Sequence, residues 1–281
     1  MKRALLLMTA ITLSAGPLLA ESNYVSPTGS DDGDGSLEKP FATLKRAATV
    51  LKPGDTCYLR EGVYREVLRP TASGTKDQPI TFAAYRGEKP VISGADRLTG
   101  WQAEGKGIYS AAMPWTLKDG DQVFLNGEML SEARWPNADK DLLFKPIRAT
   151  ASGGSPTRLS CPKLEGEKDA WKGAKLWCAG GAAWICWTTN VTAYDPKSHT
   201  LTFDKKQDKW YTPRKGNKFV LRGLRRCLDA PGEWFYDTAK KRMLMVAPAG
   251  GDINKLDIEA KRRQEVMDLR GLSYITLKGI H

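Results

Sequence analysis

The chain has 281 residues, a formal net charge of +11, five cysteines and two histidines. Its length suits one large domain or two smaller ones. The basic balance favours acidic partners, polyanionic glycans above all, unless Lys and Arg serve only to solvate the surface. The sequence contains no concentrated Lys/Arg block, which argues against a nucleic-acid partner. It also contains no CxxC motif, which argues against a metal site formed by the cysteines.

The first twenty residues have the pattern of a secretory signal peptide. Lys2 and Arg3 precede an apolar run over 4–13, and small residues lead to Ala20, after which we expect cleavage. The run is too short to span a membrane, and no later stretch reaches roughly 18 apolar residues. The sequence therefore predicts a secreted or periplasmic protein with no membrane span.

Residues 21–100 predict an opening strand, one helix and a series of short strands. The helix is expected over 41–51, where apolar residues recur at helical spacing and Pro40 occupies the first turn. The strands are expected over 24–26, 57–60, 63–68, 80–85 and 91–93. Matching strands recur about every 24 residues with no helix between them, which is typical of a solenoid whose exposed end the helix covers.

The acidic loop Ser30–Ser36 has the composition of a calcium site. Placing Gly35 at the sixth position of an EF-hand loop puts Phe41 at the twelfth, where a carboxylate is required. The pattern therefore favours a turn in which Asp side chains accept hydrogen bonds from nearby backbone groups. We expect no metal here.

Residues 101–255 differ from the preceding region. All nine tryptophans and four of the five cysteines lie there. Strand pairs separated by turns, such as 123–125 and 128–130 around Asn126-Gly127, predict antiparallel hairpins and hence a sandwich-like insertion. Trp184 and Trp187 are expected in its core.

From residue 256 the short-strand rhythm returns, with strands expected over 256–259, 266–269 and 274–280. The predicted domains are a signal peptide (1–20), an N-terminal cap with the first coils (21–100), the insertion (101–255) and resumed coils (256–281). An open solenoid end favours aggregation, so we expect it to be covered. Another subunit or a continuation of the chain could cover it, and we favour the continuation.

The ordered segments of the first region resemble a known superfamily. Tyr24–Asp31, Lys39–Leu44, Pro53–Thr56 and Leu59–Glu66 resemble the start of right-handed parallel β-helix proteins of the pectate-lyase-like superfamily. The segments 123–137 and 228–237 resemble the inserted β domain of large exported β-helix glycosidases. The resemblance implies an all-β fold: a right-handed parallel β-helix with an N-terminal capping helix, interrupted by an antiparallel β-sandwich-like insertion.

For function, the resemblance implies the N-terminal part of an exported polysaccharide-degrading enzyme, a glycoside hydrolase rather than a lyase. Its catalytic coils are expected beyond residue 281, so the catalytic residues stay unknown. The alternatives are a lyase on uronate-containing glycans, the one case in which we expect a calcium cofactor, and a non-catalytic glycan-binding solenoid. The expected partner is a polysaccharide or oligosaccharide. The positive net charge favours an acidic one.

Two groups of side chains are candidates for specific roles. Trp135 could stack on a sugar ring, and Arg134 beside it could reach a carboxylate or hydroxyl group. Cys57 is expected as a buried free thiol. The remaining cysteines are candidates for one or two disulfides whose pairing the sequence leaves open: Cys161, Cys178, Cys186 and Cys227.

Overall fold

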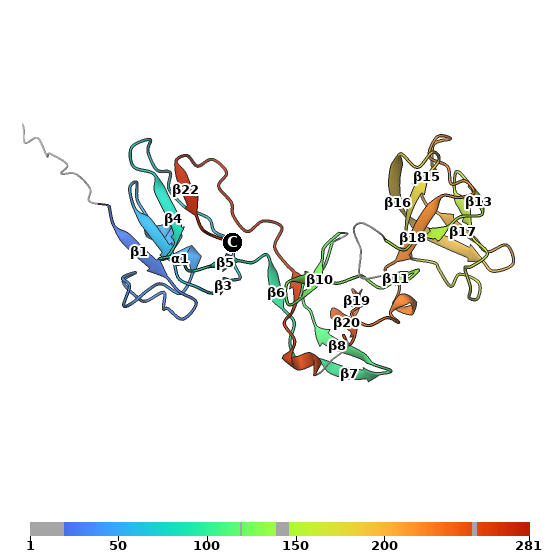
Figure 1. Cartoon of the computed structure of the whole chain (residues 1–281), viewed down its shortest axis with the longest axis horizontal. Coiled ribbons are helices and arrows are strands. Elements are labelled where there is room, and N and C mark those ends of the chain that lie inside the picture. Colours follow the sequence, from blue (N-terminus) through green and yellow to red (C-terminus); the bar gives the residue numbers. More distant parts are fainter. Residues whose placement is uncertain (1–19, 119, 139–145, 249–251) are drawn as a thin grey trace, which may run out of the picture. The chain divides into compact units, whose positions relative to one another are not determined.

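The computed structural model describes residues 20–118, 120–138, 146–248 and 252–281. The predicted signal peptide, apart from Ala20, lies outside them. The chain divides into two compact units, one of residues 1–94 with 263–281 and one of 95–262 (Figure 1). Strands dominate both, and the described residues hold one α-helix, so the fold is all-β. Across the described residues, no helix has the length and apolar character needed to cross a membrane.

A parallel sheet organises the first unit. It consists of β1 (Ser22–Val25), β2 (Thr56–Leu59), β4 (Ile80–Ala84) and β22 (Ile275–Lys278), in that order. A second parallel pair joins β3 (Val63–Tyr64) to β5 (Val91–Ile92). The chain reaches β4 from β2 without a helix, so each strand stacks on the preceding coil, as in a β-helix. β22 continues the stack on β4, although unit two separates them in sequence.

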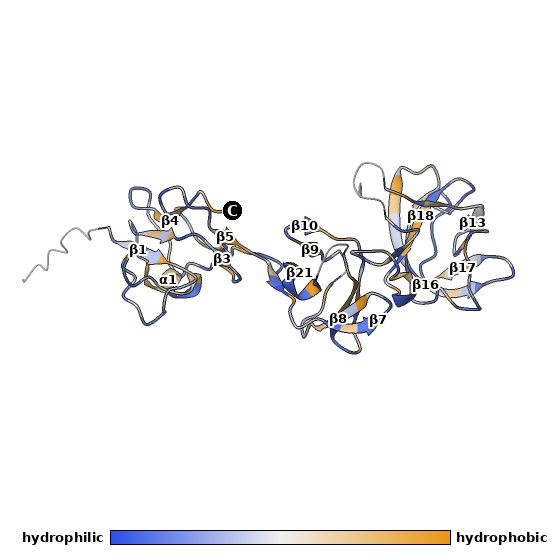
Figure 2. Cartoon of the chain, turned by 60° about the horizontal axis from the view of Figure 1, so that its bottom comes forward, coloured by the Kyte–Doolittle hydropathy of each residue, from blue (hydrophilic) through white to orange (hydrophobic). Residues whose placement is uncertain are grey.

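Stacking places equivalent side chains of successive strands above one another. Cys57 lies between Asn23 and Phe82 in the register, and all three are buried. On the outer face, the rings of Tyr24 and Tyr58 stack with centroids 5.4 Å apart. The period-two alternation of strands produces this division. Figure 2 shows hydrophobic residues concentrated in the strands and hydrophilic ones in the loops.

The helix α1 (Leu44–Val50) starts three residues later than predicted. Thr43 is its N-cap, because its side chain accepts a hydrogen bond from the Arg46 backbone N–H. Phe41, expected in the helix, instead forms a parallel bridge with Val25. The helix buries its apolar face, Leu44, Ala47 and Ala48, in the core of the first unit.

The acidic loop is a set of turns tied to the start of this helix. Asp31 Oδ1 accepts hydrogen bonds from the backbone N–H groups of Ala42 and Thr43, each at 2.9 Å, and Oδ2 accepts from the Thr43 hydroxyl at 2.8 Å. Asp34 accepts from the Ser36 N–H at 2.9 Å, and hydrogen bonds from the Ser36 side chain and from this N–H lower the pKa of Asp34. The aspartates therefore serve the backbone of the loop and of the helix.

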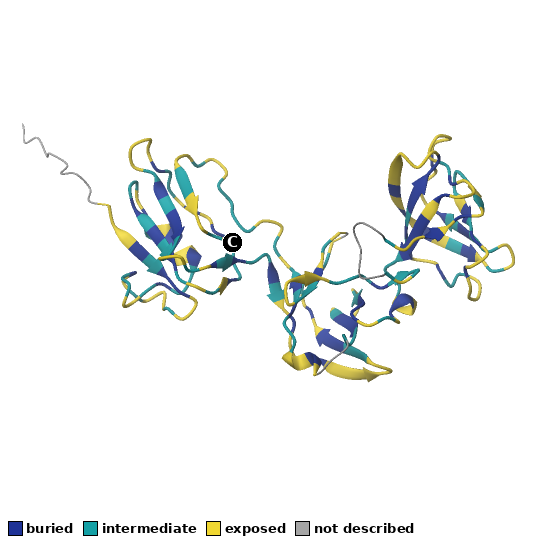
Figure 3. Cartoon of the chain, viewed as in Figure 1, coloured by how far each residue is buried: buried dark blue, intermediate teal, exposed yellow. Residues whose placement is uncertain are grey.

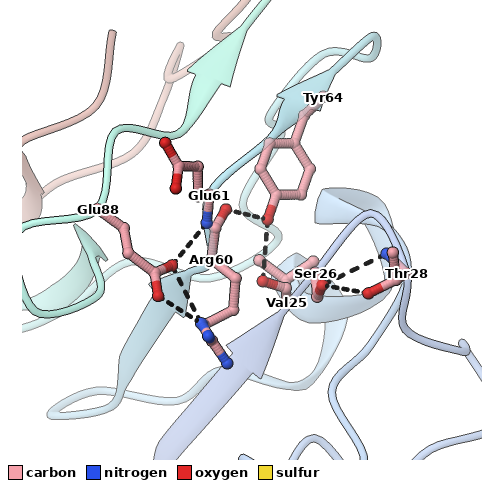
Figure 4. A network of polar contacts seen from close by, with 7 residues as sticks. All are labelled: Val25, Ser26, Thr28, Arg60, Glu61, Tyr64 and Glu88. Atoms are coloured by element: carbon pink, nitrogen blue, oxygen red, sulfur yellow. Dashed lines mark hydrogen bonds and ion pairs between the residues drawn. The ribbon is translucent and has the colours of Figure 1, made fainter.

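A polar network links successive coils next to the parallel sheet (Figure 4). Arg60 Nε lies 3.0 Å from both carboxylate oxygens of Glu88, and Glu88 also accepts from the Glu61 N–H at 2.6 Å. The guanidinium and the backbone donor hold the pKa of Glu88 below its usual value. The Tyr64 hydroxyl lies on the other side of Arg60 and contacts its carbonyl oxygen at 2.8 Å.

The second unit is built from antiparallel sheets, two of which have four strands. One has the order β10-β9-β21-β6 and contains the hairpin predicted around Asn126-Gly127, where these two residues have φ of 50° and 83°, as a type I′ turn requires. The other has the order β19-β20-β8-β7, with β7 exposed along its length (Figure 3). Their strands are β6 (Ala95–Arg97), β7 (Gln102–Gly105), β8 (Ile108–Ala112), β9 (Val123–Leu125), β10 (Glu128–Met129), β19 (Trp234–Asp237), β20 (Arg242–Val246) and β21 (Ile258–Lys261).

The largest sheet of the second unit has eight strands. Its path is β11-β18-β15-β16-β17-β14-β13, with β12 also paired to β18. Leu176, Phe219 and Leu201 are fully buried within its core. Its strands are β11 (Arg134–Trp135), β12 (Ala149–Thr150), β13 (Gly153–Ser155), β14 (Arg158–Ser160), β15 (Lys175–Gly180), β16 (Ile185–Asp195), β17 (Thr200–Phe203) and β18 (Lys218–Arg222); short 3-10 helices follow at Arg225–Cys227 and Ile253–Lys255.

Three sequence expectations differ from the structure. The strand expected over 256–259 is β21, which pairs antiparallel with β6 and β9 and so belongs to the second unit. The segment 266–269 forms no strand, only a bridge between Met267 and Leu68. Trp187 is buried as expected, but Trp184 is 91% exposed because it lies in the turn between β15 and β16, beyond the packed part of the sheet.

Candidate functional site

The two candidate residues Arg134 and Trp135 form β11, at the edge of the eight-stranded sheet, where they pair with Arg222 and Leu221 of β18. Both line a hollow of about 560 Å³. The other side chains around it come from two loops that flank the sheet: Lys163, Glu165, Trp171, Arg226 and Asp229. The structure therefore brings the candidate pair together with a second indole and with charges of both signs.

Trp135 forms an aromatic wall with its neighbours. Its ring centroid lies 5.6 Å from that of Trp171 and 5.9 Å from that of Phe219, both at tilted angles. Trp171 is buried, and its indole N–H donates to the Glu165 carbonyl oxygen at 3.0 Å. Trp135 is only half-buried. A braced and partly open indole of this kind can offer a face to the apolar side of a sugar ring.

Arg134 is held by backbone carbonyl groups. Its Nε donates to the Pro136 carbonyl oxygen at 2.9 Å, and Nη2 donates to the carbonyl oxygen of Ile147. Burial lowers the pKa of Arg134, whereas the charge of Glu233 opposes that shift. The guanidinium thus fixes the cis Trp135–Pro136 segment and adds positive charge to the hollow.

The segment that follows Trp135 is joined to the loop 228–233. The Asn137 side chain donates to Asp229 Oδ1 at 2.9 Å. Glu233 closes this loop from beneath, because its Oε2 accepts from the backbone N–H groups of Asp229 and Ala230 at 3.3 and 3.2 Å. Burial raises the pKa of Glu233, although these backbone donors act against the rise.

Arg226 packs against the ring of Trp171. Its guanidinium carbon lies 4.3 Å from the Trp171 ring centroid, a cation–π contact. Its Nη1 and Nη2 donate to the carbonyl oxygens of Ala170 and Glu165 at 3.1 and 3.3 Å. The hollow therefore combines aromatic faces with two guanidinium groups and with the exposed carboxylate of Asp229, which suits a polar ligand with hydroxyl or carboxylate groups.

Two acidic side chains outside the hollow serve structural contacts. Glu66 accepts from the N–H groups of Leu44 and Lys45 at the start of α1. Glu132 pairs with Arg222 at 2.7 Å. Glycoside hydrolysis requires two carboxyl groups facing each other across a sugar. The contacts of these carboxylates explain their presence without catalysis.

The four candidate disulfide cysteines are free thiols in the structure, as is Cys57. Cys178 and Cys186 lie on paired strands, but Cys186 stands opposite Ala179, not opposite Cys178. Neighbouring residues of a strand point to opposite faces, so Cys178 is buried while Cys186 is exposed. Cys161 and Cys227 are also buried, in the core of the same unit. Burial raises the pKa of Cys57, Cys178 and Cys227 to about 12.

Sequence reasoning missed Trp171 and Arg226. Trp171 lies in a turn and Arg226 in the three-residue 3-10 helix Arg225–Cys227, and neither segment is long enough for periodicity to predict which side chains face a site. Only the local abundance of tryptophan pointed to them. Among the described residues, His, Cys, Asp and Glu form no group of three or more suited to a metal ion.

Comparisons with known proteins match parts of this chain. Residues 23–124 match the family described as Pel9A-like, right handed beta helix region. Over 71 residues the chain is 51% identical to the uncharacterized protein YwoF of Bacillus subtilis, which covers 25% of this chain and 15% of that protein. Over 89 residues it is 38% identical to pectate lyase PEL9 of Emericella nidulans, covering 31% of this chain and 22% of that protein.

One solved structure resembles both units. It is named "Glycoside hydrolase", and the match covers 93% of this chain and 50% of that chain, with a TM-score of 0.74 and 20% sequence identity. At this identity the likeness concerns the fold. The chain spans about half the length of this structure and smaller shares of its curated relatives.

Parallel coils that stack without crossover helices define a β-helix protein. Residues 23–124 match a right-handed β-helix region, and a pectate lyase is among the relatives, so this part of the chain resembles the pectate-lyase-like β-helix superfamily. The resemblance seen in the first coils of the sequence is thereby confirmed.

Proposed function

We propose that this chain is the N-terminal part of an exported polysaccharide-degrading β-helix enzyme of the glycoside hydrolase type. The observation that carries the proposal is the hollow beside Trp135, where an accessible indole lies next to Arg134, Arg226 and Asp229. These groups suit a sugar ring with its hydroxyl groups. In this proposal the hollow binds part of the glycan, and the catalytic pair belongs to coils beyond those described here.

Two observations favour a hydrolase. The solved structure that covers both units bears that name, and the chain corresponds to about half of it. The leader over 1–20 would export the protein, α1 would cap the first coil, and the second unit would be an insertion in the β-helix.

A lyase is the second candidate, because residues 23–124 match a Pel9A-like region and one curated relative is a pectate lyase. A lyase would act on a uronate-containing glycan, and only then do we expect calcium as a cofactor. A non-catalytic glycan-binding solenoid is the third candidate, in which the hollow alone provides the function.

Calorimetric titration of the chain with neutral xylo-oligosaccharides and with oligogalacturonates tests the proposal. We expect saturable binding that Trp135→Ala weakens by about tenfold or more, equivalent to about 1.4 kcal/mol. Trp177→Ala is the matched control, since Trp177 is also half-buried in the same sheet but contacts Arg148 instead of the hollow.

The proposal is wrong if neither glycan class binds, or if Trp135→Ala and Trp177→Ala bind as the unaltered chain does. Binding of oligogalacturonates alone, strengthened by calcium, would favour the lyase. Thermal unfolding of both variants shows whether the sheet itself has been preserved.

A further inference from the structure

Three aromatic side chains of the second unit stay exposed at one end of its largest sheet. Trp184 is 91% exposed, Trp210 is 64% exposed and Tyr211 is 36% exposed. Together with Ile185 and Arg214 they line a second hollow, of about 360 Å³. We call Trp184, Trp210, Tyr211 and Arg214 the aromatic platform. None of these residues lines the hollow beside Trp135.

The backbone beneath the aromatic platform is closely packed. The turn after β15 lies directly against the segment 210–212: a Cβ atom on Gly180 would lie 2.1 Å from the Tyr211 carbonyl oxygen, and one on Gly181 would lie 1.7 Å from that of Trp210. The Gly181 N–H donates to the Thr212 carbonyl oxygen at 3.1 Å. Only glycine permits so close an approach. The side chains are therefore exposed on a fixed backbone.

Polar side chains fix the same backbone from the other side. The indole N–H of buried Trp187 donates to the Tyr211 carbonyl oxygen at 3.0 Å. Asn217 joins the two segments, since its Nδ2 donates to the Gly181 carbonyl oxygen at 3.0 Å and its Oδ1 accepts from the Arg214 N–H at 2.8 Å. A platform held in place before a ligand arrives loses little conformational entropy on binding.

The surroundings of the aromatic platform are cationic. The segment 204–218 contains six Lys and Arg residues and two Asp residues. Both aspartates serve the local fold: Asp204 accepts from Thr189 and Asn190, and Asp208 accepts from the Trp210 N–H at 2.9 Å. Lys209 Nζ lies 5.1 Å from the Trp210 ring centroid, and Arg214 lines the hollow itself.

We propose that the aromatic platform is a second glycan-binding site, selective for chains that carry carboxylate groups. The indole faces would take the apolar faces of sugar rings, and Arg214 would pair with a uronate carboxylate in a charge-assisted hydrogen bond. A second copy of this chain fits less well, because two such cationic surfaces would repel each other. The inference rests on the proposed role in glycan degradation but uses residues separate from the Trp135 hollow.

The test is binding of a galacturonate hexamer, with xylohexaose as the neutral control of equal length. We expect Trp184→Ala and Trp210→Ala each to weaken hexamer binding by about tenfold or more, and Arg214→Gln to reduce the preference for the acidic glycan. Raising NaCl from about 50 to about 500 mM should weaken binding of the acidic hexamer only. Since Trp184 is almost fully exposed, its replacement should leave the unfolding temperature unchanged.

The variants at Trp135 and Trp184 separate the two sites. Loss of galacturonate binding in Trp184→Ala, with the effect of Trp135→Ala preserved for its own ligand, supports the inference. Unchanged binding in Trp184→Ala and Trp210→Ala overturns it, and so does equal affinity for the two hexamers. Sedimentation that shows a dimer broken by Trp184→Ala would also overturn it, since the platform would then be a subunit interface. If Trp135→Ala leaves glycan binding unchanged while the platform variants weaken it, only the proposed role of the Trp135 hollow is contradicted.

Discussion

The hydroxyl oxygen of Tyr64 lies 2.9 Å from the backbone carbonyl oxygen of Val25, thirty-nine residues earlier in the chain. Val25 ends β1, and Tyr64 ends β3 in the next coil. The hydroxyl has one proton to share between this carbonyl and that of Arg60. The contact joins consecutive coils where the parallel sheet gives way to a turn, and burial raises the pKa of Tyr64.

Replacing this hydroxyl should weaken the first unit. Tyr64→Phe removes the one hydroxyl donor that the Val25 and Arg60 carbonyl oxygens share, while the Arg60 N–H still donates to the Val25 carbonyl oxygen at 2.9 Å. We expect the substitution to lower the free energy of unfolding by about 1 kcal/mol. Urea denaturation measures the change. Tyr58→Phe is the control, because Tyr58 stacks on Tyr24 and its hydroxyl makes no hydrogen bond to the described residues. Equal effects of the two substitutions would contradict the assignment.

The acidic loop should stabilise the helix without a metal. Asp31→Ala removes the acceptor of three hydrogen bonds at the start of α1, so we expect a loss of about 1 kcal/mol in unfolding free energy. Asp32→Ala, whose carboxylate makes no hydrogen bond to the described residues, should have little effect. Thermal unfolding with and without a calcium chelator completes the test. A large shift on chelation would restore the calcium interpretation.

The thiols should react selectively. Cys186 is exposed, and the other four cysteines are buried, three of them with the pKa raised to about 12. At about pH 8 such thiols hold almost no thiolate, which is the reactive form. Mass spectrometry after alkylation should find one modified cysteine in the folded chain and five after unfolding in urea. Cys186→Ser should abolish the modification of the folded chain. Thiols that resist alkylation in urea without reductant would instead reveal a disulfide.

Glu233 should make stability depend on pH. Its pKa is raised by burial above the unfolded value, so its contribution to stability is complete below pH 4.5 and is lost as the pH rises through the folded pKa. Glu233→Gln keeps an oxygen acceptor for Asp229 and Ala230 but cannot ionise. Its stability relative to the unaltered chain should therefore rise between about pH 4 and about pH 8. Glu167→Gln, on the exposed surface, should show no such trend in urea denaturation.

The chain alone should lack turnover. The carboxylates of Glu66, Glu88 and Glu132 serve backbone or ion-pair contacts, and our proposal places the catalytic groups on further coils. We therefore expect neither aryl-glycosides nor uronate polymers to be cleaved. Release of reducing sugar, or of unsaturated product absorbing in the ultraviolet, would show that the catalytic groups lie within these residues.

Sequence reasoning worked best where local chemistry decides the structure. The strands around Cys57 and Phe82 show the period-two alternation that predicted them. Asn126 and Gly127 predicted a hairpin turn because both residue types tolerate the positive φ angles that they have in the structure. It failed where a residue's surroundings come from distant segments. Trp184 is a large apolar residue of the kind expected in a core. The segment 210–212 packs against the turn that carries it, and the indole stays exposed to solvent.

The candidate site shows the same division. Trp135 could be chosen because tryptophan is a common sugar-stacking residue, and it does line a hollow. Arg134 could be chosen for its charge, but no local pattern predicts that its guanidinium donates to the carbonyl oxygens of Pro136 and Ile147. Trp171 and Arg226 are brought there by loops whose path no local pattern encodes.

The stacking of β22 on β4 has a consequence for the order of folding. The Arg263 N–H donates to the Gly94 carbonyl oxygen at 2.8 Å, so the chain leaves and re-enters the first unit at one place. Closing such a long loop while it is unfolded carries an entropic cost that grows with loop length. Once the residues between have folded and hold their own ends together, that cost is already met. We therefore expect the second unit to fold first and β22 to add to the sheet last.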